Sequence, residues 1–118
     1  MDIDQIKRRL REFAEARDWD QFHSPKNLAS AISVEAAELL ELFQWLSEEK
    51  SRDLDDATKE KVEQEVADVF LYLIRLADKL DIDVMAAATR KIALNAAKYP
   101  VELSKGNARK YTEFKDET

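Results

Sequence analysis

Residues 24–45, SPKNLASAISVEAAELLELFQW, decide how this chain folds. At about 100° per residue, the large apolar side chains fall within one broad stripe, which predicts an amphipathic helix ending near Trp45. Glu35 projects into the middle of that stripe, Glu38 lies on its flank beside Trp45, and Glu41 points to the polar side. A buried carboxylate loses its hydration, so it has to be paired, protonated or bound to a metal ion. We therefore expect Glu35 and Glu38 to meet a partner.

A second predicted helix, over residues 56–80, carries another acidic pair at the same spacing. Glu65 shares its face with apolar side chains, and Asp68 lies on the flank of that face with Tyr72. If the two helices pack together, four carboxylates converge, and two unit charges about 5 Å apart repel by roughly 3 kcal/mol at an effective dielectric near 20. Hard divalent cations such as Mg²⁺ or Mn²⁺ relieve that repulsion. The predicted metal ligands are Glu35, Glu38, Glu65 and Asp68. Exposed acidic pairs on helices are also common without any ion, and this reading stays open.

Composition limits the class of protein. The chain has 118 residues, of which 45% are hydrophobic and 37% charged, with one Gly and two Pro, so we expect one all-α domain. The net charge of −6 argues against binding to nucleic-acid polymers. The chain has no Cys, a charged start (MDIDQIKRRL) and no apolar run near the ~20 residues that cross a bilayer. We expect a cytoplasmic protein without a membrane partner.

Helix start signals divide the chain into four helices. Asp2, Ser24, Asp55 or Asp56, and Asp83 each precede a periodic segment and can accept a hydrogen bond from its first turn. They predict helices over about 2–17, 24–46, 56–80 and 83–99, as a domain at 1–100 and an arm at 101–118. Residues 66–77 are apolar nearly all round, and a helix apolar on every side is buried on every side. We therefore expect a second copy of the chain to cover it.

Two further groups of residues could contact a ligand. Trp19, Phe22 and His23 lie together in the predicted loop before residue 24, where aromatic side chains serve either as core plugs or as a binding surface. Lys91, Asn95 and Lys98 share one face of the fourth helix and could hold phosphate oxygens, although a solvated face gives the same pattern.

These motifs together resemble a known family. E-x-x-E, then E-x-x-D, then K-x-x-x-N-x-x-K-Y-P is similar to the MazG-like superfamily of all-α nucleoside triphosphate pyrophosphohydrolases. The stretches RDWDQFHSPKNLASAI, FQW and YPVELSKGNARKYTEF look closest to its dCTP pyrophosphatase branch. The resemblance covers nearly the whole chain. It implies a four-helix bundle completed by assembly as a homodimer or homotetramer. It also implies Mg²⁺-dependent hydrolysis of a (deoxy)nucleoside triphosphate to the monophosphate and pyrophosphate.

The resemblance also implies roles for individual residues. The Mg²⁺ ligands are the four carboxylates named above. The base and sugar pocket is implied at Trp19, Phe22, His23, Trp45 and Tyr72. The phosphate side and tail are implied at Lys91, Asn95, Lys98, Tyr99, Arg109 and Lys110. Many MazG-like proteins open the first motif with two adjacent glutamates, but Val34 precedes Glu35 here, so a mechanism that needs the extra carboxylate is not carried over.

In the expected reaction, a water activated by Glu38 or by Glu41 attacks the α-phosphorus, and pyrophosphate leaves. Cytosine follows only from the branch resemblance, and broader removal of non-standard nucleotides is the competing role. Two other classes of protein also place acidic residues on packed helices. A di-iron carboxylate bundle typically needs two Glu-x-x-His pairs, and the single His of this chain lies outside any such pair. A non-catalytic helical dimerisation module with solvated acidic faces remains the alternative.

Overall fold

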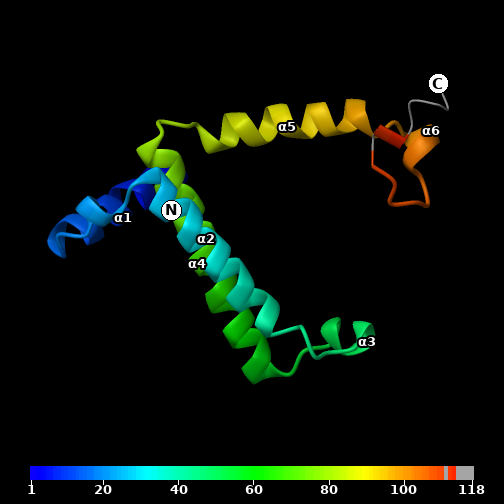
Figure 1. Cartoon of the computed structure of the whole chain (residues 1–118), viewed down its shortest axis with the longest axis horizontal. Coiled ribbons are helices and arrows are strands. Elements are labelled where there is room, and N and C mark those ends of the chain that lie inside the picture. Colours follow the sequence, from blue (N-terminus) through cyan, green and yellow to red (C-terminus); the bar gives the residue numbers. More distant parts are fainter. Residues whose placement is uncertain (111, 114–118) are drawn as a thin grey trace. The chain divides into compact units, whose positions relative to one another are not determined.

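The structure, a computed structural model, describes residues 1–110 and 112–113. In this part of the chain every regular element is a helix, which confirms the predicted all-α class (Figure 1). The elements are α1 (Ile3–Ala16), the 3₁₀ helix η1 (Asp20–Phe22), α2 (Pro25–Glu41), α3 (Glu48–Ser51), α4 (Asp56–Lys79), α5 (Val84–Lys98) and α6 (Val101–Ser104). None of these helices is long and apolar enough to span a membrane.

The four longest helices begin where the sequence predicts. In each, the side chain of the capping residue accepts a hydrogen bond from the backbone N–H three residues later, which satisfies one of the unpaired donors of the first turn. The caps and their distances are Asp2 to Gln5 (2.8 Å), Ser24 to Asn27 (3.1 Å), Asp55 to Thr58 (2.7 Å) and Asp83 to Ala86 (3.0 Å). All four predicted caps are confirmed, with Asp55 chosen over Asp56.

The first compact unit, Met1–Ile82, is built on two long helices that pack side by side in opposite directions. α2 lies along α4, and α1 and η1 complete the unit (Figure 1). Its small core contains Ala14, Leu28, Ile74 and Ala77, of which Leu28 and Ile74 are almost fully buried. One buried charge, Arg75, sits among them. The α2–α4 pair places the two acidic motifs side by side.

The second compact unit begins at Asp83 and contains α5 and α6. The expected arm over residues 101–118 starts with the short helix α6, which follows the extended backbone of Pro100. Gly106 has a φ of 80°, a left-handed conformation that glycine adopts without a steric cost. The division after Ile82 differs from the predicted domain at 1–100 and arm at 101–118, which stays a prediction.

The end of α2 differs from the prediction. The helix ends at Glu41 instead of continuing to Trp45, and the next residues form hydrogen-bonded turns. Ser47 has extended backbone and caps α3, so the chain has to leave the direction of α2 before that residue. Trp45 therefore lies beyond the end of α2, and the residue is 89% exposed.

Candidate functional site

Three carboxylates from two helices converge in the first unit. Glu35 and Glu38 come from successive turns of α2, and Glu65 comes from α4. One carboxylate oxygen of each lies within 4.8 Å of the other two. The three-residue spacing places both α2 side chains on one face, and the packing of α4 brings Glu65 opposite them. The sequence predicted this meeting, and the structure brings together three of the four proposed ligands.

The acidic trio, Glu35, Glu38 and Glu65, is partly buried. Glu35 Oε2 and Glu65 Oε2 are buried, and no group in residues 1–110 or 112–113 gives either a hydrogen bond. Burial first, and then the neighbouring Glu38 and Asp68, raise the pKa of Glu35 to about 7. Burial and the charge of Glu38 also raise the pKa of Glu65. Carboxylate oxygens that are buried and accept no hydrogen bond are suitable ligands for a divalent cation such as Mg²⁺ or Mn²⁺.

Asp68, the fourth predicted ligand, lies beside the trio. It follows Glu65 by three residues on α4, and its charge is one of the causes, after burial and Glu38, that raise the pKa of Glu35. Its side chain is exposed and borders the neighbouring pocket. Glu41, the alternative catalytic base, is the last residue of α2 and is also exposed. The assignments of these residues as ligand and base stay predictions.

A pocket of about 540 Å³ opens between α1, α4 and the segment that includes η1. Its apolar wall comes from Met1, Ile6, Leu10, Phe13, Trp19 and Leu71, and its polar groups are Arg9, His23, Asp68, Tyr72 and Arg75. Trp19 packs edge-on against Phe13, with ring centroids 5.7 Å apart. A mostly apolar cavity with a few polar groups is typical of a site for a small organic ligand.

The structure places only some of the predicted base-pocket residues there. Trp19, His23 and Tyr72 line the cavity together with Asp68. Phe22 and Trp45 do not line it, and their side chains are 59% and 89% exposed. The predicted phosphate-side residues Lys91, Asn95, Lys98, Tyr99, Arg109 and Lys110 all lie in the second unit. Their roles stay predictions.

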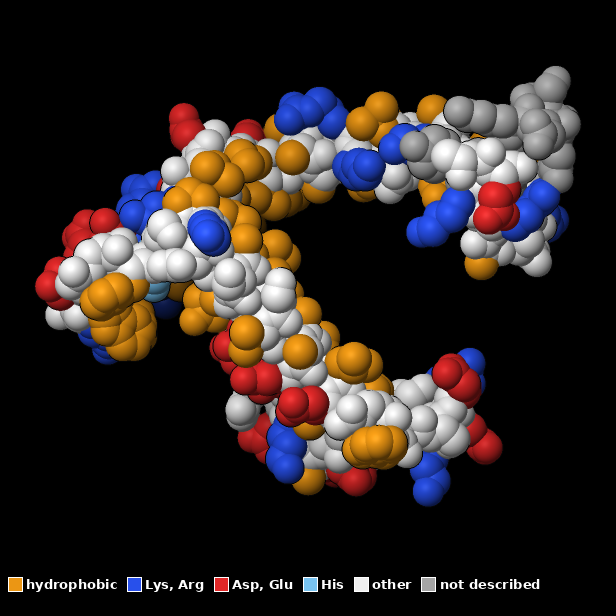
Figure 2. Space-filling view, in the orientation of Figure 1, with side chains coloured by type: hydrophobic (Ala, Val, Ile, Leu, Met, Phe, Trp, Pro, Cys, Tyr) orange, Lys and Arg blue, Asp and Glu red, His pale blue; other side chains and the backbone are white. Residues whose placement is uncertain are grey.

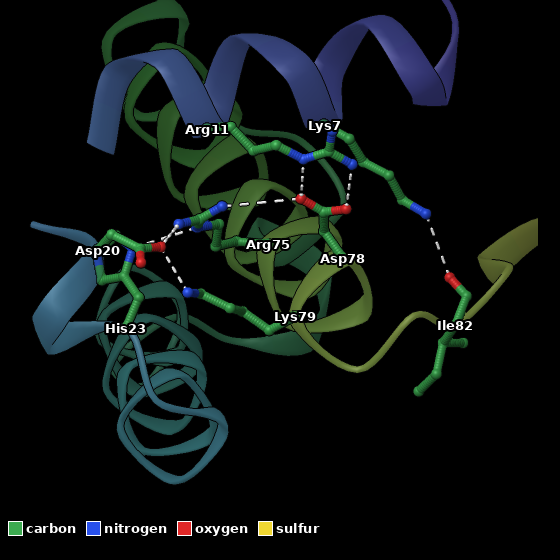
Figure 3. Close-up of polar contacts among 8 residues, drawn as sticks. All are labelled: Lys7, Arg11, Asp20, His23, Arg75, Asp78, Lys79 and Ile82. Atoms are coloured by element: carbon green, nitrogen blue, oxygen red, sulfur yellow. Dashed lines mark hydrogen bonds and ion pairs between the residues drawn. The ribbon is translucent and has the colours of Figure 1, made fainter. Parts of the chain in front are cut away.

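A charged network borders the pocket (Figure 3). Asp20 Oδ1 contacts both Arg75 Nη2 at 2.6 Å and Lys79 Nζ at 2.5 Å. Arg11 from α1 forms a two-pronged pair with Asp78, with both contacts at 2.6 Å. This pair, first through its hydrogen bonds, holds the pKa of the Asp78 carboxyl below its usual range. The network ties α1 and the segment before α2 to the same stretch of α4.

Sequence reasoning missed this network. The sequence feature that could have revealed the network is Arg75, the single positive charge inside the apolar run of α4. A cation at a buried position needs anions to pair with it. The sequence could not name those anions, since Asp20 lies 55 residues away along the chain.

Comparison with known proteins agrees with this geometry. The model of the MazG-like family matches residues 30–114. dCTP pyrophosphatase 1 of Rattus norvegicus is 42% identical over 114 residues, which cover 95% of this chain and 67% of the relative. The Homo sapiens protein of the same name is 38% identical over the same length. A crystal structure of a pyrophosphatase from Archaeoglobus fulgidus superposes with a TM-score of 0.78 at 44% identity, over 82% of this chain and 91% of that one. The chain therefore belongs to the MazG-like family.

Proposed function

We propose that this protein is a metal-dependent nucleoside triphosphate pyrophosphohydrolase that acts on dCTP or a modified dCTP. The observation that carries the proposal is the acidic trio, with two buried and unsatisfied carboxylate oxygens, beside an aromatic pocket. The relatives named dCTP pyrophosphatase and the pyrophosphatase structure support the same chemistry. The reaction consumes one water and releases a nucleoside monophosphate and pyrophosphate.

The trio and Asp68 would hold the divalent ion. When bound, Mg²⁺ would offset the charge of the triphosphate and lower the pKa of a coordinated water. The carboxylates would fix the position of this charge, because they come from two helices, α2 and α4, that pack against each other. Glu38, or alternatively Glu41, would accept the proton of the water that attacks the α-phosphorus.

The pocket would hold the base. Trp19 offers an aromatic face for stacking, and Tyr72 and His23 offer hydrogen-bonding groups. Lys91, Asn95, Lys98 and Tyr99 of the second unit, together with Arg109 and Lys110, would contact the phosphates. A base in this pocket lies next to Asp68, which joins the pocket to the trio. The geometry thus supports recognition of the base and hydrolysis of the α–β anhydride bond at adjoining places.

We also propose that the protein works as a homodimer or homotetramer in the cytoplasm, where a nucleotide-pool enzyme meets its substrate. Figure 2 shows hydrophobic side chains at the surface of the α2–α4 pair. The exposed ones are Val34, Leu40, Val66, Phe70, Leu71 and Leu73. Val66 and Phe70 also border an open groove of about 680 Å³. Apolar surfaces of this kind usually mark protein contacts, and a second copy would cover this one.

The test is a panel of nucleoside triphosphates assayed for pyrophosphate release, with Mg²⁺, with Mn²⁺ and with EDTA. We expect turnover with either metal, highest with a cytosine triphosphate, and none with EDTA. Glu38→Gln and Glu65→Gln should each lower kcat at least about 100-fold while circular dichroism stays helical. Glu12→Gln, at an exposed position of α1, is the matched control. Near-normal turnover in both trio variants would remove the trio from the active site. No turnover of any triphosphate would leave a non-catalytic helical module.

A further inference from the structure

Arg75 is the buried charge of the first unit, and its three nitrogens are used differently. Arg75 lies on α4, and only 5% of the residue is exposed. Nη2 pairs with Asp20 Oδ1 at 2.6 Å, and Nη1 lies 3.7 Å from Asp78 Oδ2. Nε donates a hydrogen bond to His23 Nδ1 at 3.2 Å (Figure 3). The two carboxylates neutralise the guanidinium and fix its plane, and the third contact is directed at the imidazole.

This contact determines which nitrogen of His23 carries the proton. A guanidinium has only donors and stays protonated, so Nδ1 has to be the acceptor. An imidazolium, or the Nδ1–H tautomer, would place one N–H against another. The ring is therefore neutral, with its proton on Nε2.

The surroundings of the ring agree with a neutral state. Burial first, and then the positive charges of Arg75 and Lys79, lower the pKa of His23, while Asp20 acts in the opposite direction. Arg75 and Lys79 belong to α4, whereas Asp20 and His23 belong to the segment before α2. The charges that act on the ring therefore come from both elements that meet here.

The Nε2–H is left for a ligand. His23 lines the pocket of about 540 Å³. Within residues 1–110 and 112–113, the hydrogen bond of the ring is the one from Arg75, and Nε2 has no protein acceptor. The Nε2–H group therefore lies at the wall of an apolar cavity without an acceptor from the described part of the chain. It can donate a hydrogen bond to an acceptor atom of a ligand bound in that cavity.

We propose that Arg75 is a positioning residue that holds His23 as the neutral Nε2–H tautomer, so that His23 donates a hydrogen bond to an acceptor atom of the bound base. The identity of the occupant rests on the proposed function, whereas the tautomer does not. A neutral donor also has a consequence for binding mode. It does not attract the triphosphate into the base pocket as an imidazolium would, and it disfavours a base that presents an amino group at that point.

The first test is nuclear magnetic resonance of the metal-free protein, because the chain contains one histidine and its ring signals need no assignment. At pH 7, long-range ¹H–¹⁵N spectra should show Nδ1 without and Nε2 with a proton. In Arg75→Met the signals should shift toward a mixture of tautomers, and the titration midpoint should rise. Asp20→Asn removes an ion pair of Arg75 but keeps the Nε donor, so the tautomer should persist. Arg8→Met, an exposed arginine on α1, is the control.

A proton on Nδ1 in the wild-type protein would overturn the proposal, and so would a folded Arg75→Met variant with an unchanged spectrum. Neither result touches the pyrophosphatase assignment. Conversely, the absence of any turnover by the wild-type protein would refute the proposed function. The tautomer of His23 would still be decided by the nuclear magnetic resonance spectra.

The second test is kinetic and uses dCTP. Arg75→Met should raise KM about 3- to 10-fold with little change in kcat, because a hydrogen bond made equally in the ground and transition states is weakened. In a His23→Ala background the same substitution should change KM no further, since both act through one donor. Additive effects of the two substitutions would mean that Arg75 acts by a route other than His23.

Discussion

Replacing Glu35 with Gln should stabilise the metal-free protein at neutral and alkaline pH. The amide keeps the shape of the side chain but removes one charge from the acidic trio. Burial and the nearby carboxylates raise the pKa of Glu35 from 4.5 to about 7. A difference of this size corresponds to about 3 kcal/mol when the group is fully ionised. Because part of the side chain contacts solvent, screening reduces the expected gain to roughly 1–2 kcal/mol.

The pH dependence follows from the direction of this change. Between pH 4.5 and about 7 the folded protein holds the Glu35 proton more tightly than the unfolded chain does. The free energy of unfolding therefore falls as pH rises through this window, and the loss is complete above it. The advantage of Glu35→Gln should be absent near pH 4.5 and full at pH 8.

The assay is thermal unfolding followed by circular dichroism at one protein concentration, in EDTA, at pH 4.5 and pH 8. At pH 8 the variant should melt roughly 3–10 °C above the wild type. Saturating Mg²⁺ should raise the melting temperature of the wild type more than that of the variant, because the amide is a poorer ligand. Glu12→Gln corrects for the change in net charge. Equal melting temperatures at pH 8, or the same difference at both pH values, would refute the idea that burial and the neighbouring carboxylates make ionised Glu35 destabilising.

Two further predictions concern the core and the pocket. Ile74 is fully buried, so Ile74→Ala should lower the free energy of unfolding by about 2–5 kcal/mol. Urea denaturation measures this loss, and a loss below about 1 kcal/mol would contradict the described packing of α4. Trp19→Leu should raise the KM for dCTP about 5-fold or more through lost base stacking, and an unchanged KM in a folded variant would place the base elsewhere.

The sequence by itself determined the four long helices and their starting points, but not the short helices η1, α3 and α6. The caps at Asp2, Ser24, Asp55 and Asp83 were predictable because each is a local interaction between a side chain and a backbone group three residues away. The apolar stripes were equally local, since they depend only on the helical period. The pairing of acidic residues with apolar faces was visible for the same reason.

The end of α2 was less predictable. The periodic pattern runs on through Trp45, but the helix ends at Glu41, because the chain has to turn before the cap of α3 at Ser47. Whether a pattern of apolar residues continues as a helix depends on where the following segment has to go. Trp45 therefore lies beyond the helix that carries Glu38.

Only the tertiary structure decided which distant groups meet. Glu35 and Glu65 are 30 residues apart, and it is the packing of α2 along α4 that brings them within 4.8 Å with two oxygens left unsatisfied. The same packing joins Arg75 to Asp20 and His23, a contact that no spacing in the sequence encodes. Local hydrogen bonds and helical periodicity act over a few residues and can be read from the chain. Burial, charge repulsion and the choice of a histidine tautomer depend on neighbours that the folded protein alone supplies.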